Sequence, residues 1–144
     1  MKIKGFTSIE LMLTIAIIAI IASFSLPVSI SFMNKNNLDI AANSFSQDMH
    51  QAQTYAKAMK NDSQWGVKVN TGEVVLFKGS TYTGRDTAYD EIISISSSII
   101  PGGTTEYVFN KFTGDLPSGY SMTLTSVDND IKTIDVNRKG MVQF

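Results

Sequence analysis

A long apolar block dominates the N-terminal part of the chain. No charged residue occurs from Leu11 to Asn34, and the run Leu11–Phe24 is almost entirely Ile, Leu, Ala and Met. Counted over residues 6–33, the block exceeds the roughly 20 residues that a membrane-spanning helix needs. The pattern therefore predicts a transmembrane helix over residues 6–33, apolar on every side.

The charges that flank this block indicate its orientation. Lys2 and Lys4 precede it, and Lys35 is the first charged residue after it. Positive residues favour the cytoplasmic side, so the N-terminus is expected in the cytoplasm and the remainder outside. A cleaved secretory signal would have an apolar stretch of about 7–15 residues, which is shorter than this one.

The spacing of apolar residues changes after Asn36 and becomes that of an amphipathic helix over residues 34–62, ending near Asn61–Asp62. Its apolar face is expected to cover a sheet. Asp48 lies between the apolar positions, and His50 is expected in solvent. Asn34–Asn37 either cap a break or continue one helix. The apolar positions are Leu38, Ala41, Ala42, Phe45, Met49, Ala52, Ala56 and Met59.

Residues 63–144 carry strand and turn signals. Trp65–Val69 and Val74–Phe77 flank a Gly-containing turn, which predicts a hairpin. Met122–Val127 and Ile131–Val136 flank Asp128-Asn129-Asp130 and predict a second hairpin. A final strand is expected at Met141–Phe144.

Three further expectations complete the C-terminal region. The isoleucines between Ile92 and Ile100 predict one strand that ends at Pro101-Gly102-Gly103. Tyr107–Phe112 predicts another strand, and the polar segment Gly79–Asp90 predicts a surface loop. The predicted fold class is α+β, with a long N-terminal helix packed on an antiparallel β-sheet head.

Composition restricts the chemistry of the chain. It has 144 residues, a net charge of -1, no cysteine and one histidine, His50. The absence of cysteine excludes disulfides and thiolate zinc sites, and a single histidine disfavours a His-based metal site or triad. Asp128-Asn129-Asp130 lacks the spacing of a calcium-binding EF loop and is better explained as a turn. No catalytic residue, metal or cofactor is predicted, and an enzyme is the least supported class.

One carboxylate interrupts the apolar block. Glu10 lies a few residues past its start. An ionised carboxylate in hydrocarbon costs several kcal/mol or more, so such residues are rare and usually paired. Alternatively, Glu10 lies at the membrane interface in the first helical turn, where the helix dipole favours a negative charge. By itself, the residue does not decide between these interpretations.

The residues Gly5-Phe6-Thr7-Ser8-Ile9-Glu10-Leu11 resemble the processing motif of type IV prepilins and type II secretion pseudopilins. In that family a short basic leader ends in Gly, and a Glu occupies the fifth mature position. Glu10 is fifth counting from Phe6. Ser8 departs from the more usual Leu. The resemblance covers residues 2–27.

This resemblance implies several site residues. A prepilin peptidase would cut between Gly5 and Phe6, and the new N-terminal Phe6 would be N-methylated. Glu10 would pair with the Phe6 amine of a neighbouring subunit, because a buried ion pair costs far less than either buried charge alone. Pro27 lies where the family commonly has a helix-kinking proline. The implied organisation is leader 1–5, transmembrane helix 6–33, amphipathic extension 34–62 and head 63–144.

The layout of the head most resembles the pseudopilin H and FimT-like group. Some FimT-like minor pilins are thought to bind DNA through a C-terminal Arg-rich motif around a Gly. Here Arg138 and Lys139 precede Gly140, but the arginine pattern is incomplete. So few positive charges make few phosphate contacts, and any DNA binding would be weak and salt-sensitive.

The expected function is therefore that of a filament subunit in a type IV pilus or a type II secretion pseudopilus. A tip-located minor pilin that binds DNA or a surface is one alternative, and a single-pass anchored domain is another. Expected partners are other pilin or pseudopilin subunits, the prepilin peptidase, the inner-membrane assembly machinery and the membrane before assembly. The expected location is the bacterial inner membrane, then a periplasmic or cell-surface filament.

Overall fold

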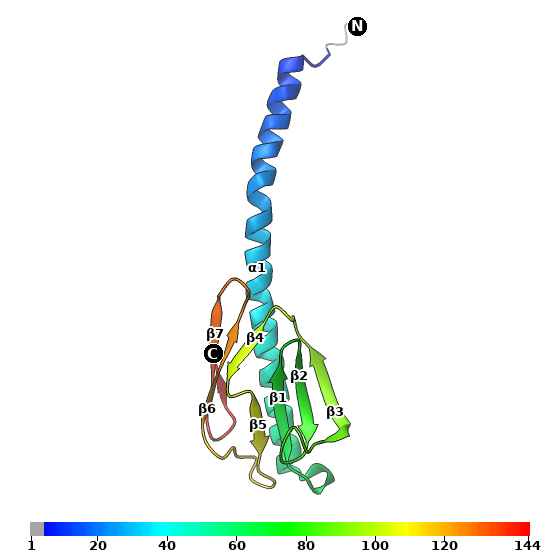
Figure 1. Cartoon of the computed structure of the whole chain (residues 1–144), viewed down its shortest axis with the longest axis vertical. Helices are drawn as coiled ribbons and strands as arrows, with labels where there is room; N and C mark the ends of the chain where they lie inside the picture. The colour runs from blue at the N-terminus through cyan, green and yellow to red at the C-terminus, as the bar shows by residue number, and fades with distance from the viewer. Residues whose placement is uncertain (1–4) are drawn as a thin grey trace. The chain divides into compact units, whose positions relative to one another are not determined.

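The computed structural model describes residues 5–144, except for the side chains of residues 24–30. The chain divides into two compact units, which meet between Met33 and Asn34. One helix, α1 (Ser8–Lys57), contributes to both units and is followed by the short 3-10 helix η1 (Lys60–Asp62) (Figure 1). The remaining elements are β1 (Trp65–Asn70), β2 (Glu73–Lys78), β3 (Asp86–Ser94), β4 (Ile100–Gly103), β5 (Glu106–Phe109), β6 (Tyr120–Thr125), β7 (Ile131–Val136) and β8 (Val142–Gln143).

Among the residues that the structure describes, no helix combines the length and the hydropathy needed to cross a membrane.

Some sequence predictions fall on residues that the structure does not describe. The predicted leader includes residues 1–4, which lie outside the described residues. The side chain of Pro27 also lies outside them, so the kink at Pro27 stays a prediction. The same holds for part of the predicted transmembrane segment, because it includes residues 24–30.

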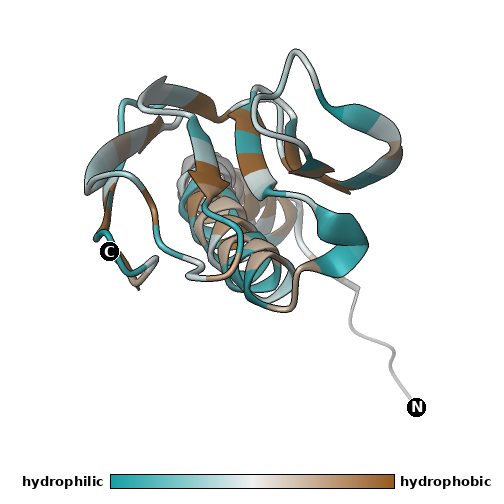
Figure 2. Cartoon of the chain, turned by 90° about the horizontal axis from the view of Figure 1, so that it is seen from below, coloured by the Kyte–Doolittle hydropathy of each residue, from teal (hydrophilic) through white to brown (hydrophobic). Residues whose placement is uncertain are grey.

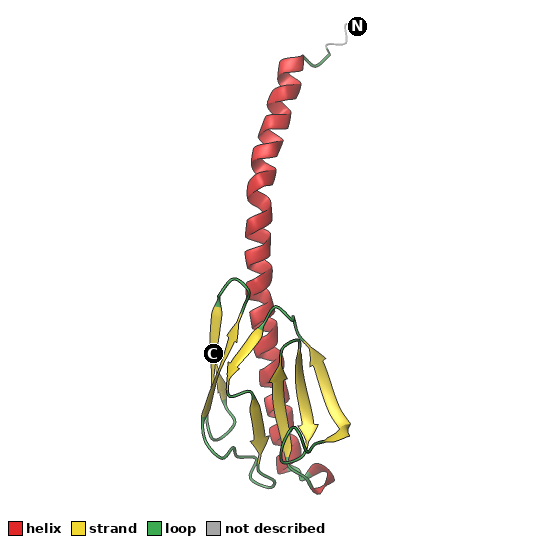
Figure 3. Cartoon of the chain, viewed as in Figure 1, coloured by secondary structure: helices red, strands yellow, loops and turns green. Residues whose placement is uncertain are grey.

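The second unit contains two four-stranded sheets with only antiparallel pairing (Figure 3). Their strand orders are β3-β2-β1-β5 (sheet A) and β4-β6-β7-β8 (sheet B). The two predicted hairpins are confirmed as β1–β2 and β6–β7, and the final strand is confirmed as β8. The predicted α+β class with an antiparallel head is therefore correct, but the head has two sheets.

The second half of α1 supplies the centre of the core, and Figure 2 shows the strands of both sheets arranged around it. The ring centroids of Phe45 on α1 and Tyr107 on β5 are 5.1 Å apart, and those of Tyr55 and Trp65 are 4.8 Å apart. The predicted apolar face is confirmed at the buried positions Leu38, Ala41, Ala42, Phe45, Met49, Ala52 and Ala56.

The end of α1 differs from the prediction. The helix stops at Lys57, before the predicted end near Asn61–Asp62. Met59 and Asn61 both adopt left-handed backbone conformations, with φ of 50° and 55°. A right-handed helix cannot continue through such residues. As a consequence Met59 is exposed, although its spacing placed it on the apolar face.

The polar residues of α1 in the second unit bear on further predictions. Asn34–Asn37 lie inside α1, so they do not break it. His50 is exposed, as expected. Asp48 was placed among the polar positions, but only 3% of its surface is exposed. It occupies the helix position that precedes Met49, which lies in the core.

The prediction of one strand between Ile92 and Ile100 is wrong. A turn at Ser96–Ser98 separates β3 from β4, which belong to different sheets. The N–H of Ile99 donates to the carbonyl of Ser96 at 3.1 Å, and the two serine hydroxyls lie 2.7 Å apart. Pro101-Gly102-Gly103 belong to β4 and pair with β6, so they do not end a strand.

The segment predicted as a loop over Gly79–Asp90 is shorter than expected, because β3 begins at Asp86. The loop itself folds over the face of sheet A opposite α1. The ring of Tyr82 packs edge-on against Phe77, with centroids 5.6 Å apart. The Arg85 guanidinium lies 3.8 Å from the Tyr82 ring and binds Asp90 at 2.8 Å. These contacts bury Phe77 on the outer side of the sheet.

The strand predicted over Tyr107–Phe112 is also shorter than expected. β5 ends at Phe109, because the N–H of Asn110 donates to the Asp115 carbonyl and closes a turn. Phe112 lies within this turn with a φ of 74° and is exposed.

Candidate functional site

The candidate site is the start of α1, where the sequence places the processing motif. Gly5, Phe6 and Thr7 lie outside regular secondary structure and are exposed. The Phe6 side chain is 86% exposed, and among the described residues beyond its chain neighbours no atom lies within 4 Å of a β-carbon added at Gly5. The bond between Gly5 and Phe6 therefore lies in an accessible, non-helical segment directly before the helix.

Thr7 and Glu10 form a reciprocal cap on the first turn of α1. The backbone N–H and the hydroxyl of Thr7 donate to Oε2 of Glu10 at 2.9 Å and 2.8 Å. In return, the N–H of Glu10 donates to the Thr7 hydroxyl at 3.3 Å. Together these bonds satisfy donors that the first helical turn otherwise leaves free. Within a single chain, Glu10 thus acts as a capping residue, and both bonds from Thr7 end on one carboxylate oxygen.

The first unit exposes large apolar side chains in every direction. Three consecutive residues, Leu11, Met12 and Leu13, are 58%, 72% and 61% exposed. Consecutive residues of an α-helix point about 100° apart, so no single face collects the polar positions. A helix that is apolar all round is normally buried in lipid or among other helices.

Two hydroxyl groups of this unit bond to the helix itself. The Thr14 hydroxyl donates to the Leu11 carbonyl at 2.9 Å, and the Ser23 hydroxyl donates to the Ile20 carbonyl at 2.7 Å. Such bonds remove the cost of placing a hydroxyl in an apolar environment. The unit is therefore compatible with apolar surroundings despite its hydroxyl groups.

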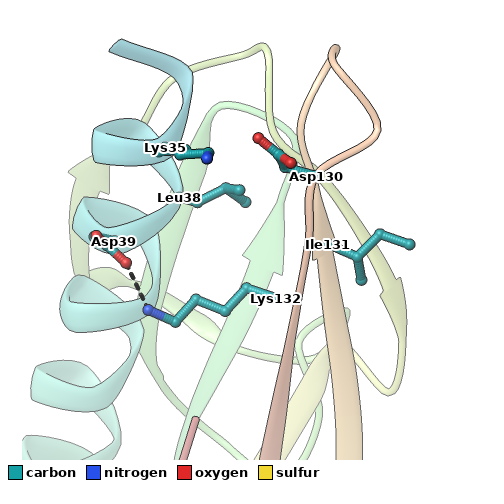
Figure 4. A pocket seen from close by; sticks show the side chains of 6 residues that line it. All are labelled: Lys35, Leu38, Asp39, Asp130, Ile131 and Lys132. Atoms are coloured by element: carbon teal, nitrogen blue, oxygen red, sulfur yellow. Dashed lines mark hydrogen bonds and ion pairs between the residues drawn. The ribbon is translucent and has the colours of Figure 1, made fainter. Parts of the chain in front are cut away.

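A polar contact and a pocket lie at the first turns of α1 in the second unit. The buried Asn34 amide donates to Asp128 at 2.7 Å, in the turn between β6 and β7. An open pocket lies beside this turn, and Figure 4 shows an ion pair in it between Lys132 and Asp39. The Lys132 Nζ atom is 2.6 Å from the Asp39 Oδ1 atom. The pocket is lined by Lys35, Leu38, Asp39, Asp130, Ile131 and Lys132. Its two lysines and two aspartates balance, so it has no charge preference for a ligand.

The C-terminal basic residues gather around one carboxylate. Lys139 binds Asp115 at 2.8 Å. This hydrogen bond, and then the positive charges of Lys139, Arg138 and Lys57, lower the pKa of the Asp115 carboxyl despite some burial. Lys57 is a member that the sequence analysis missed, because it lies at the distant end of α1. Lys132, in contrast, pairs with Asp39 and does not belong to this group.

The residues described by the structure contain no group of three or more His, Cys, Asp or Glu side chains arranged to hold a metal ion. Asp128 and Asp130 lie in the β6–β7 turn, where the N–H of Ser126 donates to the Asp130 carbonyl at 2.9 Å. Asn129, between them, has a φ of 61°. The turn explains these aspartates without a bound ion.

Comparison with known proteins gives one structural similarity. No protein-family model matches the chain, and a search of curated proteins finds no significant match. Among solved structures, the chain is similar to the minor pseudopilin EpsH from the type 2 secretion system of Vibrio cholerae, with a TM-score of 0.54 and 10% sequence identity. The similarity covers 74% of this chain and 94% of that chain. It shows a pseudopilin-like fold and confirms the predicted fold class; the FimT-like resemblance stays a prediction.

Proposed function

We propose that this chain is a filament subunit of the pilin and pseudopilin class. It assembles through the part of α1 that belongs to the first unit. Two observations carry the proposal: the exposed apolar side chains of α1 from Ile9 to Ile21, and the pseudopilin-like fold of the chain. A surface of this kind needs lipid before assembly and other apolar helices after it. A type II secretion pseudopilus is the favoured filament.

Processing is the second part of the proposal. A prepilin peptidase cuts between Gly5 and Phe6, and Phe6 becomes the N-methylated first residue. The exposed, non-helical position of both residues supports access by a peptidase. Because a β-carbon at Gly5 meets no atom of the described residues within 4 Å, a Gly5→Val variant should leave the described fold unchanged and isolate the processing step.

Glu10 has two partners in succession in this proposal. In the single chain, Thr7 binds Oε2 of Glu10. In the filament, the Phe6 ammonium of a neighbouring subunit binds the Glu10 carboxylate, because either charge alone would be strongly unfavourable among packed apolar helices. This pairing sets the axial register of the subunits.

The experiment is intact-mass spectrometry of the protein from its native host, in membranes and in sheared filaments. We expect a species that begins at N-methylated Phe6 in the sheared fraction. Glu10→Gln should be cut normally but be depleted from filaments at least about tenfold, the factor for a loss of 1.4 kcal/mol. Thr14→Val removes another polar group of the same helix and should assemble like the wild type.

Two results would contradict this proposal. An uncut chain that occurs only in membranes would leave a simple anchored domain. Normal filament levels of Glu10→Gln would remove the role given to its carboxylate. The amount of processed protein distinguishes an abundant subunit from a scarce tip subunit.

A DNA-binding tip subunit is the second candidate, supported by the cluster of Lys57, Arg138 and Lys139 around Asp115. Only weak binding is expected, since three cations and one carboxylate neutralise few phosphates. A gel shift with duplex DNA at low salt should disappear in Arg138→Ala and persist in Lys132→Ala. Absence of any shift at low salt would dismiss this candidate.

A further inference from the structure

A buried carboxyl group lies where α1 meets the edge of sheet A. Asp48 is 3% exposed, and its Oδ2 atom is buried with no hydrogen-bond partner among the described residues. The assembly role proposed above does not use this residue. A buried carboxylate without partners is costly, and such a group usually becomes protonated instead.

A second carboxyl group approaches from strand β3. Glu91 pairs with Leu76 across β2–β3. Leu76 belongs to the same core as the buried residues of α1, so Glu91 lies on the face of the sheet that packs against the helix. The Gln51 amide on α1 donates to Glu91 Oε2 at 2.7 Å, and the Tyr55 hydroxyl donates to Oε1 at 3.3 Å. Gln51 also donates to the Tyr55 hydroxyl at 2.8 Å. These bonds attach β3 to the helix.

β3 depends on this attachment more than the other strands of its sheet. It is an edge strand, hydrogen-bonded to β2 alone. Its pairing with β2 is interrupted by a register shift between Leu76 and Lys78. Most residues of β3 are exposed, so little apolar burial holds it in place. Loss of the contact with α1 would release β3 and leave β1, β2 and β5 paired.

We infer that Asp48 and Glu91 form a proton-dependent latch, which holds β3 on α1 while Asp48 carries a proton and loosens when Asp48 ionises. A neutral Asp48 is compatible with the buried site and with the Glu91 charge. An ionised Asp48 is compatible with neither, because its buried Oδ2 atom has no hydrogen-bond donor and the charge of Glu91 has the same sign. Release of β3 exposes Asp48 to water and increases its distance from Glu91.

The titration falls near neutral pH. Burial, and then the negative charge of Glu91, raise the pKa of Asp48 from 3.8 to about 7. Because the folded pKa is the higher one, this contribution to stability is complete below about pH 4 and is lost as the pH rises through 7. Around the contact, the other titratable groups are Tyr55, Tyr89, and the lysines above their rings, Lys60 and Lys78. His50 is exposed, and residues two apart do not share a helix face.

The test is amide hydrogen exchange of the full chain in detergent micelles, from about pH 5 to pH 8, corrected for the intrinsic pH dependence of exchange. The latch predicts that β3 amides open about a hundredfold more at pH 8 than at pH 5, because opening increases about tenfold per pH unit until it levels off above the Asp48 pKa of about 7. Amides of the β6–β7 hairpin serve as the internal reference and should not change. Asp48→Asn, which is neutral at every pH, should abolish the effect on β3.

Two further variants separate this inference from alternatives. His50→Gln removes the single imidazole of the chain and should retain the hundredfold effect. Glu91→Gln removes the like charge and should move the transition to lower pH, which decides the matter even if Asp48→Asn folds poorly. A wild-type β3 that opens equally at pH 5 and pH 8 overturns the latch. So does an unchanged pH effect in Asp48→Asn, or an equal change at β3 and the β6–β7 hairpin.

Discussion

The Phe77 ring lies so close to Gly66 in the neighbouring strand that a β-carbon added at Gly66 would stand 2.6 Å from its Cζ atom. The two residues are direct partners in the β1–β2 register. The same β-carbon would lie 2.6 Å from the backbone oxygen of Tyr107 in β5. The space at Gly66 is therefore filled from both neighbouring strands.

Gly66→Ala should therefore destabilise the head by about 2 kcal/mol, since overpacking typically costs about 1–3 kcal/mol. The Phe77 ring can move, but the Tyr107 oxygen belongs to the paired backbone. Denaturant unfolding followed by the fluorescence of Trp65, the one tryptophan of the chain, measures the change. Gly84→Ala is the matched control, because its added β-carbon meets only the rotatable Thr81 hydroxyl at 3.1 Å. Equal stability of both variants would refute the packing argument.

The turn between β6 and β7 should depend on its contact with α1. Asp128→Ala leaves the buried Asn34 amide without its acceptor, which should cost about 1 kcal/mol. Asp130→Ala removes another carboxylate of the same turn. Asp130 supports the turn through its backbone carbonyl, which the substitution keeps. Thermal unfolding of both variants measures the difference. If Asp130→Ala is the more damaging change, the Asn34 bond is not what secures this turn.

The first helical turn should fray when its cap is removed. Thr7→Val deletes the hydroxyl that exchanges hydrogen bonds with Glu10. Amides at Ser8–Leu11 should then exchange about fivefold faster, as expected for a lost N-cap. Thr14→Val deletes a hydroxyl that bonds within the helix and should leave these amides unchanged. Unaltered exchange in Thr7→Val would show that Glu10 caps the helix without Thr7.

Tyr107 should make the head sensitive to alkali. Its phenol is buried and donates to the Thr104 carbonyl at 2.7 Å. Burial, and then the nearby Tyr120, raise the pKa of Tyr107 above its usual value. The unfolded phenol ionises near pH 10 while the folded one keeps its proton, so the free energy of unfolding should fall as the pH rises above about 10.

Substitution isolates this contribution. Tyr107→Phe should cost about 1 kcal/mol at neutral pH through the lost hydrogen bond. Above about pH 10 its stability should fall less steeply than that of the wild type. Denaturant unfolding at about pH 7 and pH 11 measures both effects, with Tyr120→Phe as the control. Parallel pH profiles for the wild type and Tyr107→Phe would exclude Tyr107 as the cause.

The sequence by itself determined the elements whose signals are local. The β1–β2 and β6–β7 hairpins followed from alternating apolar residues around short turns. The buried face of α1 followed from helical spacing at residues such as Leu38, Phe45 and Met49. The Thr7–Glu10 cap also corresponds to a Thr-x-x-Glu pattern in the sequence, although Thr7 was not predicted as a partner of Glu10.

Contacts between distant segments were decided only by the tertiary structure. The isoleucines from Ile92 to Ile100 looked like one strand, but the turn at Ser96–Ser98 sends β3 and β4 to different sheets, and apolar content alone does not encode sheet membership. Lys57 joins Arg138 and Lys139 only because the end of α1 lies beside Asp115.

Asp48 shows the same limit most clearly. In sequence it is a polar residue between apolar positions, and its helical spacing gives no sign of a missing partner. Folding places it 3% exposed at the contact between α1 and β3, where the charge of Glu91 acts on it. Periodicity reports which face of a helix a residue occupies, whereas burial and pKa depend on the strand that packs there. The local pattern thus predicted the helix, whereas the packing of β3 against it buries Asp48 and raises its pKa to about 7.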